Sequence, residues 1–179
     1  VPVEKIPEQV KNAFIAAEDK NFYTHGGIDY VGIVRALLGN IKNIGSGRRP
    51  AGASTITQQV AKNMLLSSEL SYTRKIKEAI LATRIENAFS KDHILELYLN
   101  EIYLGNRSYG VAAAALNYFG KSLNELNIEE IAYLAALPKG PNNYHPKRKY
   151  EAAVGRRNWV LDRMSEEGYI SEEEAAAAK

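Results

Sequence analysis

Two neighbouring carboxylates stand at a point in this sequence where they could transfer a proton. Glu18 and Asp19 open the run EDKNFYTHGG, directly after an apolar stretch that predicts a helix over 8–17. Each adjacent carboxylate raises the cost of ionising the other, so Glu18 is suited to be a base with a raised pKa that takes a proton from a sugar hydroxyl. In the alternative interpretation both carboxylates are solvated and His25 is a structural hydrogen-bond donor.

A second polar cluster lies in the run GASTITQQVAKN. Ser54 or Thr55 can cap a helix whose free N–H groups attract an anion such as diphosphate. On that helix Thr55, Gln59 and Asn63 share one face, at positions i, i+4 and i+8, and Lys62 lies beside them. The face suits sugar hydroxyls and phosphate, although an exposed polar face without a ligand has the same pattern.

Two further motifs carry charges that suit a leaving diphosphate. In RKIKE, Arg74 and Glu78 share a helix face, where Glu78 could orient cations or a metal ion. The alternative is a surface salt bridge, which stabilises a fold by less than ~1 kcal/mol. In LPKGP, Lys139 lies in a rigid turn between two prolines and is either a fixed phosphate contact or an exposed turn residue.

Helical periodicity dominates the elements that must position these residues, and no strand alternation is evident. The sequence therefore predicts a mostly α fold. Helix ends are predicted by the pair Asn127 and Glu130, by the pair Ser171 and Glu174, and by Gly168 after a helix over 150–167. Three more helix faces are formed by apolar residues: Tyr30, Ile33, Val34, Leu37, Leu38 and Ile41; Ile76, Ile80, Leu81, Ile85 and Phe89; and Ile94, Leu95, Tyr98, Leu99 and Ile102.

One segment breaks this pattern. The run from Gly39 to Gly52, GNIKNIGSGRRPAG, is rich in glycine and predicts a mobile loop between two helices. We expect it to order when a donor binds, because Arg48 and Arg49 could close over phosphate.

Composition limits the class of protein. A chain of 179 residues suits a single domain over 1–179, and a net charge of +2 gives no basic stripe for nucleic acid. There is no cysteine, which excludes disulfides and thiolate metal sites. No apolar run reaches the ~20 residues of a spanning helix, and residues 1–5 do not resemble a secretory signal. Whether a membrane anchor precedes this sequence stays open.

The order and spacing of these motifs are more specific than any one motif. EDKNFYTHGG, ASTITQQVAKN, RKIKE, KDHILELYLNEIYLG and YFGK together resemble the ordered motifs of the peptidoglycan glycosyltransferases, which occur in class A penicillin-binding proteins and monofunctional transglycosylases. The resemblance runs from about Ile6 to Ile170. It implies an all-α, lysozyme-like fold with a large lobe, a smaller membrane-facing lobe and a cleft between them.

The resemblance also implies a reaction. Lipid II, a disaccharide-peptide on undecaprenyl diphosphate, would be polymerised with inversion into a β-1,4 glycan at the outer face of the bacterial cytoplasmic membrane. Glu18 matches the general base on the acceptor 4-hydroxyl. The remaining matches are Asp19, Phe22 and His25, which shape that site; Ser54, Thr55, Gln59, Lys62 and Asn63 at the donor; and Arg74, Glu78 and Lys139 at the diphosphate.

No organic cofactor is implied, and a divalent cation (Mg²⁺ or Mn²⁺) near Glu78 is compatible with the resemblance. Donor mimics of the moenomycin class would inhibit the enzyme. Two departures concern loop details: Ala53 replaces the second of two usual glycines, and the segment 39–52 is a few residues longer than in the family.

Two other functions remain open from sequence. A lysozyme-like muramidase or lytic transglycosylase needs a catalytic glutamate but not the cations Lys62, Arg74 and Lys139. A non-enzymatic lipid- or glycan-binding module would keep the fold, yet a decayed site usually loses a carboxylate, and both Glu18 and Glu78 are present.

Overall fold

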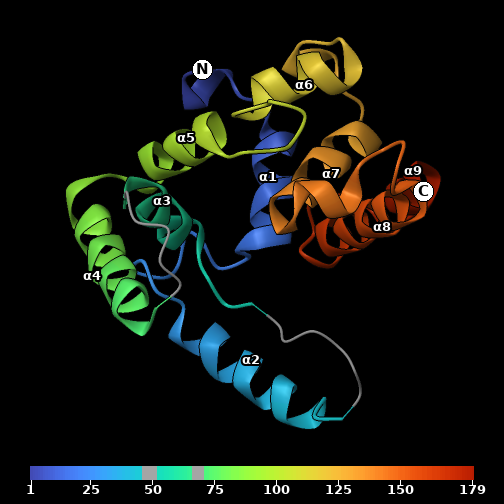
Figure 1. Cartoon of the computed structure of the whole chain (residues 1–179). Helices are drawn as coiled ribbons and strands as arrows, with labels where there is room; N and C mark the ends of the chain where they lie inside the picture. The colour runs from blue at the N-terminus through green and yellow to red at the C-terminus, as the bar shows by residue number, and fades with distance from the viewer. Residues whose placement is uncertain (46–51, 66–70) are drawn as a thin grey trace. The chain divides into compact units, whose positions relative to one another are not determined.

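The computed structural model describes residues 1–45, 52–65 and 71–179. Within these ranges the regular structure is helical, and the one β interaction is an isolated bridge between Tyr103 and Tyr109. This confirms the predicted mostly α fold (Figure 1). The α-helices are α1 (Glu8–Glu18), α2 (Tyr30–Lys42), α3 (Ile56–Met64), α4 (Tyr72–Ala88), α5 (Lys91–Glu101), α6 (Val111–Phe119), α7 (Ile128–Ala136), α8 (Tyr150–Glu166) and α9 (Glu172–Ala178). The 3₁₀ turns are η1 (Val3–Lys5), η2 (Leu123–Glu125), η3 (Leu137–Lys139) and η4 (Pro141–Tyr144).

The chain divides into two compact units. The larger unit holds residues 1–20 and 95–179, and the smaller unit holds residues 21–94. In the larger unit α1 packs against α7 and α8, and α8 also packs against α9 (Figure 1). The core of this unit includes Phe14, Leu134 and Leu161, all fully buried. The apolar half of α1 is thus anchored, which fixes where its last residue lies.

Local capping chemistry sets the helix ends as the sequence predicted. Asn127 and Glu130 form a capping box at α7, and Ser171 and Glu174 form another at α9. Gly168 follows α8 with a φ of +79°, a left-handed conformation that glycine adopts without strain.

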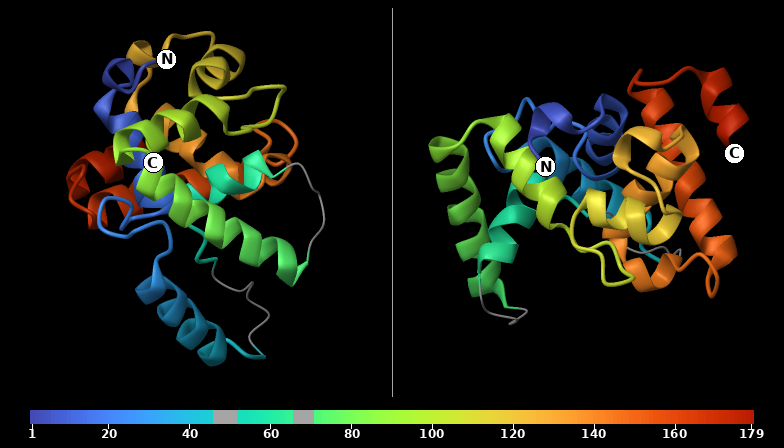
Figure 2. Two further views of the ribbon diagram at one scale, coloured as in Figure 1. Left: turned by 90° about the vertical axis from the view of Figure 1, so that its left-hand side faces the viewer. Right: turned by 90° about the horizontal axis from the view of Figure 1, so that it is seen from above.

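In the smaller unit α3 packs along α4 (Figures 1 and 2). The apolar face predicted for α4 is wrong in part, because Ile76 and Ile80 are at least half exposed. The buried face is formed instead by Glu78, Ala82 and Ile85. These residues also follow the helical spacing, and the short side chain of Ala82 is compatible with close packing of a neighbouring element.

The loop predicted from Gly39 begins later than expected. Helix α2 continues to Lys42, because the apolar periodicity runs on through Ile41 and outweighs the cost of about 1 kcal/mol for a glycine in a helix. Residues 46–51, which include Arg48 and Arg49, lie outside the described residues, so the expectation that this segment orders on donor binding stays a prediction. No residue of α2 is buried.

Candidate active site

In the larger unit the two adjacent carboxylates lie where α1 ends. Glu18 is the last residue of the helix, and Asp19 caps it with its backbone N–H donating to Ile15 O at 2.9 Å. The side chain of Glu18 is 14% exposed, and Asp19 is buried. A helix C-terminus carries partial negative charge, so two carboxylates here need compensation from elsewhere.

Arg156 from α8 supplies part of that compensation, and it was not among the site residues predicted from the sequence. Its Nη2 lies 4.0 Å from Glu18 Oε1, and its side chain is 14% exposed. The guanidinium carbon lies 3.8 Å from the centre of the Trp159 ring. Burial lowers the pKa of Arg156, while the charge of Glu18 opposes that shift. The guanidinium is therefore held between an aromatic face and the carboxylate.

Tyr98 from α5 is a second neighbour that sequence reasoning assigned only to the core. Burial raises the pKa of its hydroxyl well above the ordinary value, and the charges of Glu18 and Asp19 raise it further. Among the described residues its hydroxyl has no hydrogen-bond partner. A buried hydroxyl without a hydrogen bond is costly, so Tyr98 places an energetically unfavourable polar group in the core near the two carboxylates.

Lys139 completes the predicted site residues of the larger unit. It ends η3, in the turn between α7 and η4, and its side chain is exposed. Gly140 N donates to Leu137 O at 3.0 Å and closes that turn. The lysine is thus an exposed cation on a short, hydrogen-bonded turn.

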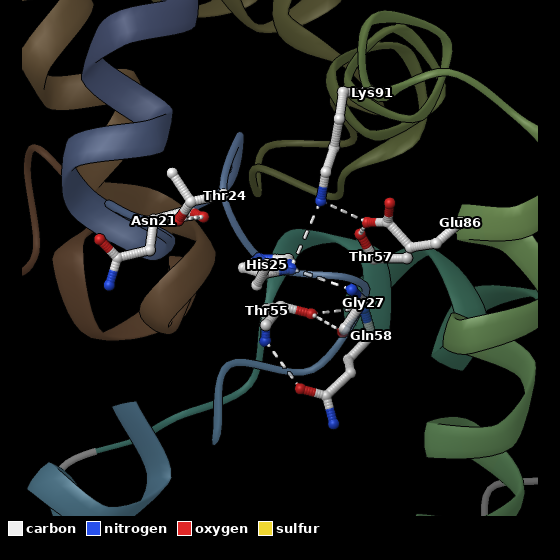
Figure 3. Close-up of polar contacts among 9 residues, drawn as sticks. All are labelled: Asn21, Thr24, His25, Gly27, Thr55, Thr57, Gln58, Glu86 and Lys91. Atoms are coloured by element: carbon white, nitrogen blue, oxygen red, sulfur yellow. Dashed lines mark hydrogen bonds and ion pairs between the residues drawn. The ribbon is translucent and has the colours of Figure 1, made fainter. Parts of the chain in front are cut away.

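In the smaller unit Phe22 and His25 belong to the turn over residues 20–28, and Figure 3 shows the polar contacts of His25. Phe22 is fully buried, with its ring edge-on to His25 at 6.1 Å between centroids. His25 Nδ1 accepts a hydrogen bond from Gly27 N at 3.0 Å. Lys91 Nζ lies 4.7 Å from the centre of the Phe22 ring. The pair predicted to shape an acceptor site is therefore fixed by neighbours on both sides.

The N-terminus of α3 is capped by Thr55, as predicted. Its Oγ1 accepts from Gln58 N at 3.0 Å and donates to Gly27 O at 2.7 Å. Gln58 returns a bond to Thr55 N and completes a capping box. The Thr55 hydroxyl is thus committed to holding α3 against the turn at Gly27, and Thr55 itself is buried.

Beyond the cap, α3 presents the polar side chains that the spacing predicted. Gln59 is half-buried, and Lys62 and Asn63 are exposed. Ser54, just before the cap, is exposed and accepts a hydrogen bond from Lys75 Nζ at 2.9 Å. The structure thus leaves this face open to solvent at most of the predicted positions.

Glu78 is buried in α4 and pairs with a cation that the sequence analysis did not select. Lys75 Nζ lies 2.7 Å from Glu78 Oε1, and the two side chains are 55% and 6% exposed respectively. Arg74, which the sequence placed on the same face, is half-buried. The spacing i, i+3 between Lys75 and Glu78 could have indicated this pair.

The described residues bear on the expectations of a metal ion and of a membrane. In residues 1–45, 52–65 and 71–179, no group of three or more His, Cys, Asp or Glu side chains is arranged to hold a metal ion. Over the same ranges, every helix is too short or too polar to cross a bilayer.

Comparisons with known proteins assign the chain to a family. The sequence profile described as Transglycosylase matches residues 1–165. Penicillin-binding protein 1A of Aquifex aeolicus is 56% identical over 97% of this chain and 24% of its own length. The protein of that name from Rickettsia bellii is 54% identical, over 99% of this chain and 22% of the relative. This chain therefore spans about a fifth of the length of these curated relatives.

A solved structure agrees with the sequence comparisons. The crystal structure of penicillin-binding protein 1A from Haemophilus influenzae matches with a TM-score of 0.56 and 33% sequence identity, over 99% of this chain and 17% of that one. This neighbour confirms the lysozyme-like fold that the motif resemblance implied.

Proposed function

Because this chain belongs to the transglycosylase family, as a peptidoglycan glycosyltransferase domain, we propose that it polymerises lipid II into β-1,4 glycan strands. The reaction inverts the configuration at the donor's anomeric carbon and releases undecaprenyl diphosphate. The observation that carries the proposal is the partly buried Glu18 at the end of α1, beside the guanidinium of Arg156.

Glu18 is the general base of this proposal. It takes the proton of the acceptor 4-hydroxyl as that oxygen attacks the anomeric carbon, and the bond from that carbon to the diphosphate oxygen breaks. Arg156 supports this assignment because a cation near a carboxylate favours the ionised form, which is the form that accepts a proton. Direct attack by the acceptor requires no covalent sugar–enzyme intermediate.

The cations of the chain serve the leaving diphosphate. Negative charge develops there in the transition state, so fixed positive groups at that end lower the barrier. Lys62 on α3 and Lys139 after α7 are exposed cations suited to phosphate oxygens. Glu78 holds Lys75, and through it Ser54, at the N-terminus of α3. Helix N-termini favour anions for the same electrostatic reason.

A divalent cation at the diphosphate is part of the proposal. Glu78 supplies one buried carboxylate, and Mg²⁺ is commonly held by one or two carboxylates together with substrate phosphate oxygens. Glu78 would be the protein ligand of such an ion, which would offset the negative charge that develops on the leaving diphosphate.

We infer that this domain acts at the outer face of the bacterial cytoplasmic membrane, and the exposed side chains of α2 support contact with a membrane surface. Tyr30, Val34, Leu37, Leu38 and Ile41 on this helix are all more than half exposed. Apolar side chains of this kind on one helix suit the boundary between headgroups and acyl chains, where the lipid tail of the substrate must stay. Donor mimics of the moenomycin class are expected to bind at the diphosphate end and to inhibit.

One experiment separates this function from its nearest rival. The chain is incubated with lipid II and, in parallel, with purified peptidoglycan sacculi. We expect glycan strands from lipid II and no soluble muropeptides from sacculi, because the diphosphate-binding cations serve only a lipid-linked donor. Release of muropeptides without polymerisation would instead favour a muramidase or lytic transglycosylase, and neither product would favour a binding module.

A further inference from the structure

Trp159 is the single tryptophan of the chain, and it lies on α8 between two arginines at helical spacing. The guanidinium carbon of Arg156, three residues earlier, lies 3.8 Å from the centre of the indole ring. That of Arg163, four residues later, lies 5.8 Å from the same point. Both distances are within the range of a cation–π interaction. The tryptophan is 39% exposed, so it is only partly withdrawn from water.

The two arginines differ in their other partners. Arg163 Nη1 donates to Glu166 Oε2 at 2.6 Å, and Nη2 lies 3.9 Å from Glu167 Oε1. These carboxylates follow on the same helix or directly after it, so they hold Arg163 with or without the indole ring. Arg156 instead has Glu18 at 4.0 Å, a distance too long for a hydrogen bond. The position of Arg156 therefore depends more on the ring.

The surroundings of the Arg156 guanidinium indicate what the ring does for it. Among the described residues, the Nε of this arginine makes no hydrogen bond. Burial lowers the pKa of Arg156, because the charged form loses water, while Glu18 and Tyr144 act in the opposite direction. The planar guanidinium stacks well on an aromatic face. Without that face, we expect the guanidinium to regain water by turning toward solvent, away from Glu18.

The charges around Glu18 show why the place of this cation matters. Asp19 carries the same sign of charge, and the C-terminus of α1 adds partial negative charge. Tyr98 of α5 is also close enough for both carboxylates to raise the pKa of its hydroxyl. Arg156 brings positive charge to this negative group of residues. Its distance from Glu18 therefore affects how readily that carboxylate takes up a proton.

We propose that Trp159 is a positioning residue for proton transfer to Glu18, because its ring holds the Arg156 guanidinium beside that carboxylate. This inference rests on the proposed function, in which Glu18 is the base. The ring needs no contact with substrate for this role, and all the groups involved belong to the larger unit. A ring that only covers α8 and stabilises the fold would leave the pH dependence of the reaction unchanged.

The first test compares pH–rate profiles on lipid II. Trp159→Leu removes the ring, so the acid limb of kcat should move to higher pH. This shift has the same direction as that of Arg156→Met and is no larger, because the cation stays in the chain. Trp159→Tyr keeps an aromatic face and should restore the wild-type limb. An acid limb that stays in place in Trp159→Leu, or moves to lower pH, overturns the proposal.

Two further variants on α8 serve as controls for this shift. Arg163→Met removes the other cation near the ring and should keep the wild-type acid limb, because Arg163 pairs with Glu166 rather than with Glu18. Tyr150→Leu removes another aromatic ring from the same helix, at a position that is 67% exposed, and should also keep it. A shift in either control as large as that in Trp159→Leu would contradict a specific role of the indole ring.

A double variant tests whether the ring acts through Arg156. In Trp159→Leu combined with Arg156→Met, the acid limb should stay where Arg156→Met alone places it, because the two residues act as one unit. A further shift to higher pH in the double variant would mean that the ring acts on Glu18 by another route, and would overturn the proposal.

The single tryptophan also allows a test without turnover. Indole emission responds to a charge held against the ring, so emission should change as the pH passes through the acid limb and Arg156 loses the attraction of ionised Glu18. This change should be absent from Arg156→Met and from Glu18→Gln. Its absence from the wild type, or its persistence in both variants, contradicts the coupling. If Trp159→Leu does not fold, this titration and the profile of Trp159→Tyr decide.

The two proposals fail in different ways. If the chain makes no glycan from lipid II while Trp159 emission follows Glu18 as described, the proposed function fails although ring, guanidinium and carboxylate are coupled. If the chain polymerises lipid II and Trp159→Leu leaves the acid limb in place, only the role of Trp159 fails.

Discussion

The two carboxylates proposed for the reaction lie in different electrostatic settings. Glu18 in the larger unit is 4.0 Å from Arg156, beyond hydrogen-bond distance, and each of these side chains is 14% exposed. Glu78 in the smaller unit is 6% exposed and contacts Lys75 at 2.7 Å, while the lysine side chain is 55% exposed. A fixed cation at a distance favours the charge of Glu18. A close cation with a flexible stem instead commits Glu78 to orienting a positive group. The distance of the cation thus distinguishes Glu18, the proposed base, from Glu78, the proposed orienting carboxylate.

The largest expected effect comes from removing the base. Glu18→Gln keeps the shape of the side chain but cannot take a proton, so kcat on lipid II should fall by at least ~10²-fold. Lipid II binding and the circular dichroism spectrum should stay close to wild type.

Glu8→Gln is the matched control, because Glu8 lies on the same helix with its side chain 75% exposed and forms an ion pair with Lys11. It should retain full activity. A Glu18→Gln variant that polymerises within tenfold of wild type would sink the assignment of the base.

Removing the orienting carboxylate should have a smaller effect on the same step. Glu78→Gln releases Lys75 from α4 and weakens its hold on Ser54, so we expect kcat to fall by about 10- to 100-fold while the pH profile keeps its shape. Single-turnover rates on lipid II would measure this loss. Lys77→Met, an exposed cation on the same helix, should leave the rate unchanged. If Glu78→Gln instead shifted the acid limb of the pH–rate profile, Glu78 would also take part in proton transfer, and the distinction between the two carboxylates would be wrong.

A change at Arg156 tests whether the cation near Glu18 favours the ionised form of that carboxylate. Replacing Arg156 by Met removes the cation that favours ionised Glu18, so protonation of the carboxylate becomes easier and the acid limb of the pH–rate profile should move to higher pH. Below that limb the variant loses activity, and well above it the rate should recover.

The neighbouring Arg157 provides the control for this shift. Its guanidinium donates to Asn158 Oδ1 and to Lys179 O, away from Glu18, so Arg157→Met should keep the wild-type profile. An unmoved acid limb in Arg156→Met would show that the guanidinium does not act on the base.

Features set by local chemistry could be predicted from the sequence. The capping boxes at Asn127 and Ser171 satisfy helix N–H groups within three residues, so the pattern and the structure coincide. The position of Glu18 at the end of α1 follows in the same way from apolar periodicity. The exposed polar side chains at Lys62 and Asn63 also follow from helical spacing.

Features set by tertiary packing could not be predicted in this way. Arg156 and Tyr98 reach Glu18 from helices far along the chain, and only the fold brings them together. On α4 the pattern of apolar residues predicted that Ile76 and Ile80 would be buried. The helix packs against α3, yet its buried face includes Glu78 instead. Thr55 shows an intermediate case, because the cap was predictable but its bond to Gly27 O was not.

Helix α2 differs from α1 in the burial of its apolar side chains, and changes on α2 have the smallest expected effect, a loss of membrane binding. The larger unit buries the apolar side of α1, whereas α2 in the smaller unit buries no residue although its sequence is as apolar. We expect the exposed side chains to insert into the headgroup region of a bilayer, while Arg35 and Lys42 reach anionic headgroups with their stems along lipid. Leu37→Glu or Leu38→Glu should each weaken liposome co-sedimentation by about tenfold, because each removes an exposed leucine whose insertion into the bilayer is worth about 1.5 kcal/mol, the lower end of the value for burying a leucine.

Leu116→Glu is the matched control for α2. Leu116 lies on α6 in the larger unit and is 64% exposed, close to the 58% of Leu37 and the 56% of Leu38. The control adds the same charge at a similarly exposed leucine, so it separates loss of an apolar contact on α2 from general repulsion by an anionic bilayer. We expect Leu116→Glu to sediment with liposomes as the wild type does. Equal binding by all three folded variants would remove α2 as the membrane contact, and its exposed apolar face would then need another partner, because such a face is rarely left in water.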